Sequence, residues 1–177
     1  MGARFRPGAF HAFWPGALSD LQNSIADLQQ VFPAADAAYI ARVAALDDAA
    51  VVAALIALLR ARQPQPDPNI ELINQIIAAI ETADGPQTVA ALASTFERSE
   101  RWVQQLFHDY LGIGLKWLLQ RHCLLAAAAQ IHDTDKPDWA DIAYDSGYAS
   151  RAHFNTHFKK APGRTPTQYK LWTSRAP

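Results

Sequence analysis

The sequence predicts an all-α fold. Apolar side chains recur every three or four residues through most of the 177-residue chain, and no stretch alternates with a period of two for long enough to form a strand. Turns rich in Pro and Gly separate the periodic segments. Hydrophobic residues make up 50% of the chain, which excludes intrinsic disorder, and a chain of this length buries roughly two thirds of its unfolded surface. One or two packed helical domains are therefore expected, without support from a metal or a disulfide.

The first sixteen residues are expected to form an extended strap. Pro-Gly occurs at residues 7–8 and again at 15–16, so no helix should run through the segment. Four large aromatic side chains in this segment need an apolar surface to pack on: Phe5, Phe10, Phe13 and Trp14. We interpret the segment as a strap on the helices that follow. The alternative is the remnant of a larger upstream domain.

Three helices are predicted to follow the strap. The first begins at Ser19 or Asp20 and ends before Pro33. Its apolar residues recur at three and four positions: Leu18, Leu21, Ile25 and Leu28. A second helix covers residues 35–46, and Asp47 caps a third that runs to about residue 62. The third is so rich in Ala, Val, Leu and Ile that we expect most of its faces to be buried.

A proline-rich segment divides the chain. Residues 63–68 contain three prolines, which favours an extended hinge. The isoleucines after it share one face of a predicted helix from Asn69 to about Ala83, and Asp84-Gly85-Pro86 ends that helix. The predicted division is a strap and helical region, a connecting helix and a C-terminal domain: residues 1–66, 67–86 and 87–174.

Six short helices are predicted in the C-terminal half, at residues 88–96, 99–111, 114–132, 138–146, 150–161 and 166–172. The second and fifth superpose with an offset of 51 residues, which places Ser99 on Ser150, Val103 on Phe154 and Phe107 on Phe158. Each of the two follows a short helix with a central Ala and a tight turn. A short helix, a turn and a second helix with a polar outer face form a helix-turn-helix, so the sequence predicts this motif twice.

The charge is divided unevenly along the chain. The whole chain carries 16 Lys and Arg against 17 Asp and Glu, a net charge of −1. Residues 1–87 hold 5 Arg and no Lys against 7 Asp and 2 Glu, a charge of −4, whereas residues 88–177 sum to +3. From Asp145 to the end, including Arg175, the charge is +5. The second predicted motif is therefore the expected place for a polyanion.

These residues resemble a known family. The segment from Gly147 to Lys160, followed by Gly163-Arg164-Thr165-Pro166 and Tyr169, is similar to the C-terminal signature of AraC/XylS-type transcription regulators. Residues 99–112 resemble the first recognition helix of the same domain. The resemblance covers residues 87–172, about half of the chain. It implies a seven-helix unit in which a long helix, here 114–132, connects two helix-turn-helix motifs, preceded here by a small helical N-terminal region.

The resemblance implies a function as well as a fold. Such a protein is a bacterial-type, cytoplasmic, nucleoid-associated transcription factor, without a cofactor or enzymatic activity, that binds double-stranded promoter DNA and acts on RNA polymerase. The connecting helix would span ~28 Å, which suits two recognition helices in successive major grooves ~34 Å apart. Residues 1–87 resemble, less specifically, the end of a regulatory region, and the helices of residues 47–83 could close on each other or on a second copy. The alternative is a helical protein-interaction or small-molecule-binding module with decayed DNA affinity.

The outer faces of the two recognition helices supply the candidate DNA contacts. Side chains suited to read base edges are Arg101, Gln104, Gln105, Arg151, Ala152, Asn155 and Thr156. Side chains suited to bind phosphates are Lys116, Lys159, Lys160 and Arg164. The inner faces are expected to consist of Val103, Leu106, Phe107 and Tyr110 in the first helix and of Phe154, His157, Phe158 and Ala161 in the second. The alternative is that both outer faces are simply solvated.

One turn departs from the family pattern. Glu97 stands where the first motif would usually carry a glycine, and a non-glycine residue in a left-handed turn costs on the order of 1 kcal/mol. The second motif keeps Gly147. We therefore expect the second motif to contribute more affinity for DNA and the first more discrimination.

Other chemistry is not expected. His153 and His157 stand four residues apart, but no further ligand with metal-binding spacing accompanies them. The single Cys123 indicates a buried thiol in a reducing compartment rather than a nucleophile. The start of the chain at Met1 shows no apolar signal sequence, and the longest apolar stretch, residues 49–59, is shorter than the ~20 residues that cross a bilayer.

Overall fold

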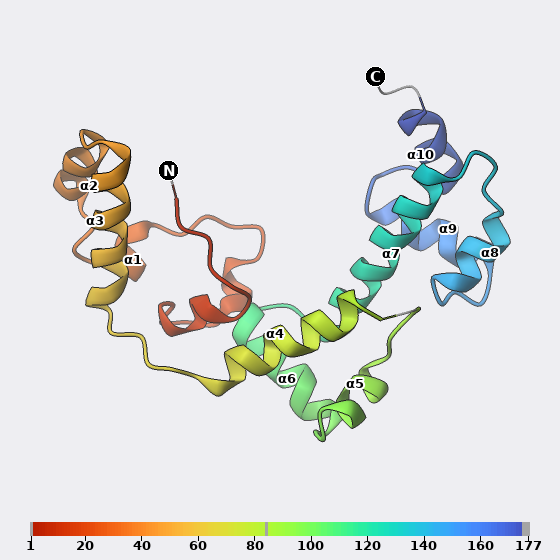
Figure 1. The fold of residues 1–177 in the computed structure, drawn as a ribbon, viewed down its shortest axis with the longest axis horizontal. Helices are drawn as coiled ribbons and strands as arrows, with labels where there is room; N and C mark the ends of the chain where they lie inside the picture. Colours follow the sequence, from red (N-terminus) through yellow and green to blue (C-terminus); the bar gives the residue numbers. More distant parts are fainter. Residues whose placement is uncertain (1, 84, 175–177) are drawn as a thin grey trace. The chain divides into compact units, whose positions relative to one another are not determined.

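The computed structural model describes residues 2–83 and 85–174, and over these ranges the protein is all-α, as predicted (Figure 1). Met1, Asp84 and Arg175, which entered the sequence predictions, lie outside the described residues. The chain forms two compact units. Unit one comprises the described residues up to Ile77 together with Arg101–Gly114, and unit two comprises Ala78–Glu100 and the described residues from Leu115 onward.

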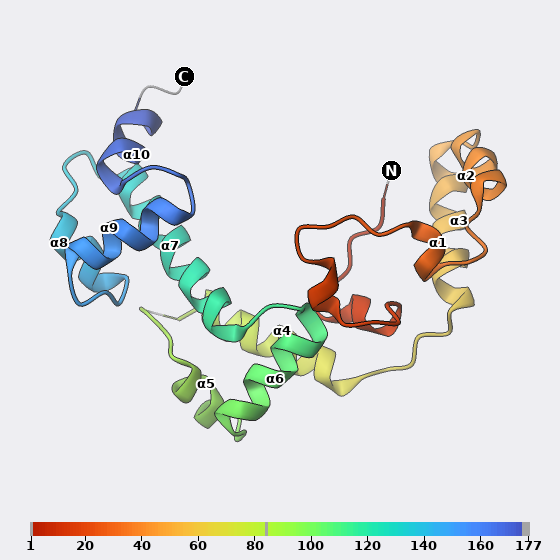
Figure 2. The same cartoon turned by 180° about the vertical axis from the view of Figure 1, so that it is seen from behind.

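Unit one begins with the strap. A 3-10 helix, η1 (Ala9–Ala12), lies within it, and η2 (Leu18–Leu21) follows. Three α-helices come next: α1 (Leu28–Val31), α2 (Ala37–Ala44) and α3 (Asp48–Ala61), which lie together in Figure 2. Phe13 is buried in a cluster with Val31, Phe32 and Ala35, and the other strap aromatics pack against that cluster. The prediction of a strap on the following helices is confirmed.

The single helix predicted between Ser19 and Pro33 is wrong. The chain leaves η2 at Gln22, which is extended, and passes through Asn23 with a φ of +53°. Ile25 is fully exposed, and Asp27 starts α1 anew by accepting a hydrogen bond from the Gln29 amide at 2.9 Å. The apolar spacing is therefore not the pattern of one continuous buried face.

The expectation that α3 is buried on most faces is also wrong. None of its residues is fully buried, and Val52 and Ile56 expose more than two fifths of their surface. The helix packs on α2, where the Tyr39 hydroxyl donates to the Ala54 carbonyl at 3.1 Å. Asp47 caps α3 as predicted, by accepting from the Ala50 amide at 2.8 Å.

Residues 63–67, the predicted hinge, form no helix. Helix α4 (Pro68–Glu81) starts one residue earlier than predicted, and Asp67 accepts from the Asn69 amide at 2.9 Å. Its isoleucine face is buried at Ile73, Ile76 and Ile80. The division into units falls within α4, after Ile77.

All six helices predicted in the C-terminal half are present within two residues of their expected bounds: α5 (Val89–Thr95), α6 (Glu100–Leu111), α7 (Leu115–Asp133), α8 (Trp139–Asp145), α9 (Arg151–Lys160) and α10 (Pro166–Thr173). Most of α6 belongs to unit one. Among the described residues, no helix combines the length and apolar character needed to cross a membrane.

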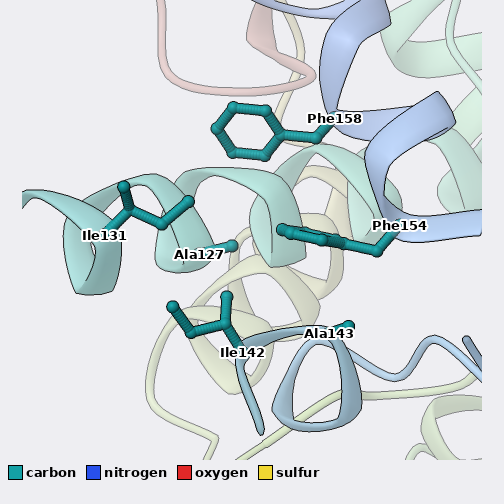
Figure 3. Close-up of a cluster of buried hydrophobic side chains, with 6 residues drawn as sticks. All are labelled: Ala127, Ile131, Ile142, Ala143, Phe154 and Phe158. Carbon is teal, nitrogen blue, oxygen red and sulfur yellow. The ribbon is translucent and has the colours of Figure 1, made fainter. Parts of the chain in front are cut away.

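Unit two is built around α7. Phe154 and Phe158 of α9 pack on this helix and on α8 (Figure 3). Ala127 and Ile131 of α7, together with Ile142 and Ala143 of α8, complete the buried cluster. This core fixes α9 with one face inward and the opposite face exposed.

Candidate nucleic-acid interface

The first helix of each motif, α5 and α8, is capped at its N-terminus by a polar side chain. Thr88 caps α5 by accepting from the Ala91 amide, and Asp138 caps α8 by accepting from the Ala140 and Asp141 amides. The two caps are 50 residues apart. Both caps are short polar side chains that satisfy free amides at a helix N-terminus.

The two turns that follow are also alike. The Arg98 amide donates to the Ala93 carbonyl and the Tyr148 amide donates to the Ala143 carbonyl, each at 2.9 Å. Glu97 has a φ of +52° and Gly147 a φ of +78°, so both turns pass through the left-handed region. The left-handed conformation expected of Glu97 is confirmed.

The motifs differ in length by one residue. Residues up to Arg98 correspond to residues 50 positions later, whereas α6 corresponds to α9 with an offset of 51. The extra residue is Ala149, between Tyr148 and Ser150. The second turn is therefore a five-residue link where the first has four.

The predicted inner face of helix α9 is buried at Phe154 and Phe158, whereas His157 is only half-buried. Ser150 caps the helix by accepting from the His153 amide at 3.2 Å. Phe154 and Phe158 are almost completely buried, with ring centroids 5.5 Å apart. The prediction that Ala161 faces inward is wrong, because the helix ends at Lys160 and Ala161 is exposed beyond it.

The outer face of α9 holds the candidate base-reading side chains. Arg151, Ala152 and Thr156 are exposed, and Asn155 is half-buried. The Arg151 guanidinium lies 5.9 Å from the centre of the Trp139 ring, which orients its side chain at the start of the helix. The Thr156 hydroxyl donates to the Ala152 carbonyl at 3.0 Å, which leaves its methyl group free to point outward.

Helix α6 shows the same division of faces. Val103, Leu106 and Phe107 are buried, as predicted. The three candidate base-reading residues of this helix are all exposed: Arg101, Gln104 and Gln105. The Gln105 amide nitrogen donates to an Asp109 carboxylate oxygen at 2.7 Å. Gln105 must break this bond before it can donate to a base.

Four basic side chains were predicted to bind phosphates, and all four are exposed: Lys116, Lys159, Lys160 and Arg164. The Arg164 guanidinium lies 5.2 Å from the centre of the Trp172 ring. A further basic residue of the C-terminal segment is engaged elsewhere, because the Lys170 ammonium donates to the His132 carbonyl at 3.0 Å and so caps the end of α7.

The comparisons with known proteins match this region. A model of the helix-turn-helix domain matches residues 92–171. The regulatory protein SoxS of Escherichia coli K12 is 31% identical over 101 residues, which cover 56% of this chain and 94% of SoxS. The chain belongs to the AraC/XylS family of transcription regulators. SoxS of Salmonella typhimurium is 30% identical over the same length.

Two solved structures have a similar fold over about half of this chain. The C-terminal domain of AraT, a response regulator from Geobacillus stearothermophilus, is 26% identical with a TM-score of 0.52, over 56% of this chain and 84% of that one. An AraC-type regulator from Chromobacterium violaceum is 21% identical with a TM-score of 0.53, over 59% of this chain and 93% of that one. The protein is thus a sequence-specific DNA-binding regulator of the AraC type rather than an enzyme.

Tyr110 was predicted to lie on the inner face of α6, but its partner Asp67 was not predicted. Tyr110 at the end of α6 is half-buried, and its hydroxyl donates to an Asp67 carboxylate oxygen at 2.5 Å. Burial, and then the hydrogen bond to Asp67, raise the pKa of Tyr110 above its ordinary value. No local pattern could reveal this pair, because 43 residues separate the partners.

His153 and His157, which the sequence analysis did not assign to a metal site, lie next to each other on α9. The Nε2 atoms of His153 and His157 lie 3.1 Å apart, and the Tyr148 ring contacts both imidazoles. Within the ranges that the structure describes, no group of three or more potential ligands is close enough to hold a metal ion. Cys123 is half-buried in α7, and burial raises the pKa of its thiol.

Proposed function

We propose that this AraC-family regulator reads promoter DNA with both motifs, by inserting α6 and α9 into successive major grooves. The observation that carries the proposal is the repetition of the turn. Both turns have the same 2.9 Å hydrogen bond and a residue with positive φ, and each leads into a helix with one buried and one polar face. This is the arrangement by which a recognition helix is held in a groove.

The base-reading roles follow from the exposed side chains. Arg101 and Arg151 suit a bidentate contact with guanine, and Gln104, Gln105 and Asn155 suit a bidentate contact with adenine. Ala152 and the methyl group of Thr156 suit the thymine methyl group. Helix α6 carries three side chains that suit a bidentate contact with a base and α9 carries two, so we assign α6 the larger part of base discrimination.

Affinity is assigned mainly to the second motif. Lys159, Lys160 and Arg164 lie at the end of α9 and just beyond it, and Lys116 lies at the start of α7. Contacts of these side chains with phosphates fix register and affinity but do not read sequence. The absence of a glycine at position 97, and the negative charge of Glu97, weaken the first motif by comparison.

The other assignments belong to the same proposal. Residues 87–174 act as the DNA-binding domain, residues 67–86 as the connection, and residues 1–66 as a helical region derived from a regulatory domain. RNA polymerase is the expected protein partner, a second copy of the chain is a further candidate through α3 and α4, and the nucleoid in the cytoplasm is the expected location.

Selection of bound sequences from random DNA, followed by titration at several salt concentrations, tests the proposal. Two half-sites about one helical turn apart are expected, with log Kd changing by about 0.9 per decade of salt for each phosphate contacted. Lys159→Ala should reduce that slope by about 0.9 without changing the selected sequence. Arg151→Ala should relax one base position at a loss of about 1–3 kcal/mol.

Arg60→Ala is the matched control, because Arg60 is an exposed arginine on α3, outside both motifs. It should leave the slope and the selected sequence unchanged. Binding that is absent or insensitive to salt would refute the proposal and favour a module that binds protein or a small molecule.

A further inference from the structure

The first recognition helix is held by parts of the chain that precede the helix-turn-helix domain. The domain model begins at residue 92, and the match to SoxS accounts for 94% of SoxS but only 56% of this chain. Yet α6 belongs to the same compact unit as the strap, η2 and the first half of α4. We use the name α6 clasp for the residues of these segments that contact the C-terminal end of α6: His11, Leu18, Gln22, Asp67 and Asn69.

The first point of contact is the Tyr110 side chain. Its hydroxyl donates to an Asp67 carboxylate oxygen at 2.5 Å and accepts from the Asn69 side-chain amide at 2.9 Å. The His11 ring stacks on the Tyr110 ring, with centroids 4.1 Å apart and planes 19° from parallel. The strap, through His11, and the start of α4, through Asp67 and Asn69, therefore both contact the Tyr110 side chain.

The second point of contact is the backbone at Gly112, just after α6. This residue is buried and has a φ of +69°. A Cβ atom there would lie 2.5 Å from the carbonyl carbon and oxygen of Leu18, closer than real Cβ atoms come. The Gln22 side-chain amide also donates to the Gly112 carbonyl. The start of η2 is thus packed backbone against backbone on the end of α6.

These contacts fix the direction of the helix. An α-helix is stiff over its length, and α6 has 12 residues, so an anchor at its C-terminal end sets the angle of the outer face at its N-terminal end. The anchored residues are Tyr110 and Gly112, and the outer face holds Arg101, Gln104 and Gln105.

We propose that the α6 clasp positions the first recognition helix for DNA, so that Tyr110 and Gly112 are positioning residues and the strap is a working part of the first motif. The inference rests on the proposed function, in that it requires α6 to read DNA.

The test uses the full chain and an operator selected from random DNA. The half-site that each helix reads is assigned with Gln104→Ala and Arg151→Ala, by the base position at which each variant loses specificity. Tyr110→Phe keeps the ring and removes only the hydroxyl. We expect it to weaken binding to the intact operator about tenfold, the effect of one hydrogen bond to a charged group. On an operator whose α6 half-site is scrambled, Tyr110→Phe should bind like the wild type.

Two controls separate positioning from folding. Tyr144→Phe removes a hydroxyl from a tyrosine of α8 that is 80% exposed, and it should bind both operators like the wild type. Gly112→Ala and Gly85→Ala both place a methyl group on a residue with positive φ, but only the methyl group at position 112 meets neighbouring atoms. Gly112→Ala should therefore lose the α6 half-site, and Gly85→Ala should keep it.

The outcomes are distinct. Footprints in which Tyr110→Phe and Gly112→Ala lose protection only over the α6 half-site support the clasp. Equal loss over both half-sites, or no loss, overturns the clasp while the proposed function stands. Failure of the wild-type chain to select any sequence refutes the proposed function and the clasp together.

Discussion

Replacement of Glu97 by glycine should stabilise the protein. Glu97 is an exposed residue whose φ of +52° lies in the left-handed region. The turn itself is well formed, because the Glu97 amide donates to the Ser94 carbonyl at 3.1 Å and the Arg98 amide to the Ala93 carbonyl at 2.9 Å. Glu97→Gly keeps both backbone bonds and removes the Cβ atom that makes this conformation unfavourable.

The expected gain is the difference between two terms. Relief of the left-handed conformation is worth about 1–2 kcal/mol, and the added freedom of glycine in the unfolded chain costs about 0.4–1 kcal/mol. The free energy of unfolding should therefore rise by about 0–1.6 kcal/mol, with a central value of about 0.8 kcal/mol. For a chain of this size the central value corresponds to an increase in Tm of roughly 2–3 °C.

Thermal unfolding followed by circular dichroism measures the effect. Glu97→Ala is the control, because it removes the same charge but keeps a Cβ atom, and it should not reproduce the gain. Gly147→Ala makes the opposite change in the second turn, where φ is +78° and the new methyl group would lie 3.1 Å from the Pro86 Cβ atom, so it should lower Tm. If Glu97→Gly lowers Tm, or if Glu97→Ala raises it equally, the strain argument is wrong.

Three further predictions follow from the core and the titratable groups of unit two. Phe154→Ala empties a fully buried site and should lower the free energy of unfolding in urea by about 3–5 kcal/mol; a loss below 1 kcal/mol would contradict the packing. Burial raises the pKa of Cys123, so its thiol should react with a disulfide reagent more slowly in the folded protein than in urea, and the reaction should become faster as the pH rises. Equal reaction rates in the folded protein and in urea would count against burial. Burial, and then the charges of His153 and Lys160, lower the pKa of His157 below its ordinary 6.5, so protonation favours the unfolded chain and the free energy of unfolding should fall as the pH drops through 6.5. His157→Gln should reduce that fall. If the free energy of unfolding of the variant depends on pH as in the wild type, His157 is excluded as the cause.

Sequence alone predicted the helices whose start is decided within a few residues. Asp47, Asp138 and Ser150 each cap a helix through an amide two or three residues later, so the signal and its cause lie together in the chain. Thr165, followed by Pro166, forms a complete capping box in the same way. The C-terminal helices were predicted well for this reason.

Elements that depend on distant partners were missed. The segment after η2 has helical spacing, but Gln22 is extended and its side chain is bonded to Gly112, 90 residues away. The apolar content of α3 indicated burial, but the helix packs on α2 and, through Leu58 and Leu59, on the cluster around Phe13, while Val52 and Ile56 stay exposed. Composition alone does not say how much apolar surface the rest of the fold can cover.

In the candidate site, too, exposure that follows from the local helical period was predicted, and contacts with distant residues were not. The period of α6 predicted correctly that Arg101, Gln104 and Gln105 are exposed, since buried and exposed positions alternate with the helical turn. The same reasoning failed at Ala161, which lies one residue beyond the end of α9. The bond of Tyr110 to Asp67 required the three-dimensional structure, whereas Gln105 and Asp109 stand four residues apart on one helix, a spacing that itself favours their bond.

The extra residue in the second turn limits how the two motifs can be exchanged by protein engineering. Transplanting α9 in place of α6 with one constant offset would misplace either the opening helix or the recognition helix by one position, which rotates side chains by about 100° around a helix. A chimera that retains both faces must change its offset from 50 to 51 at Ala149. Hybrid regulators with reassigned half-site specificity should therefore be joined within this turn and not within a helix.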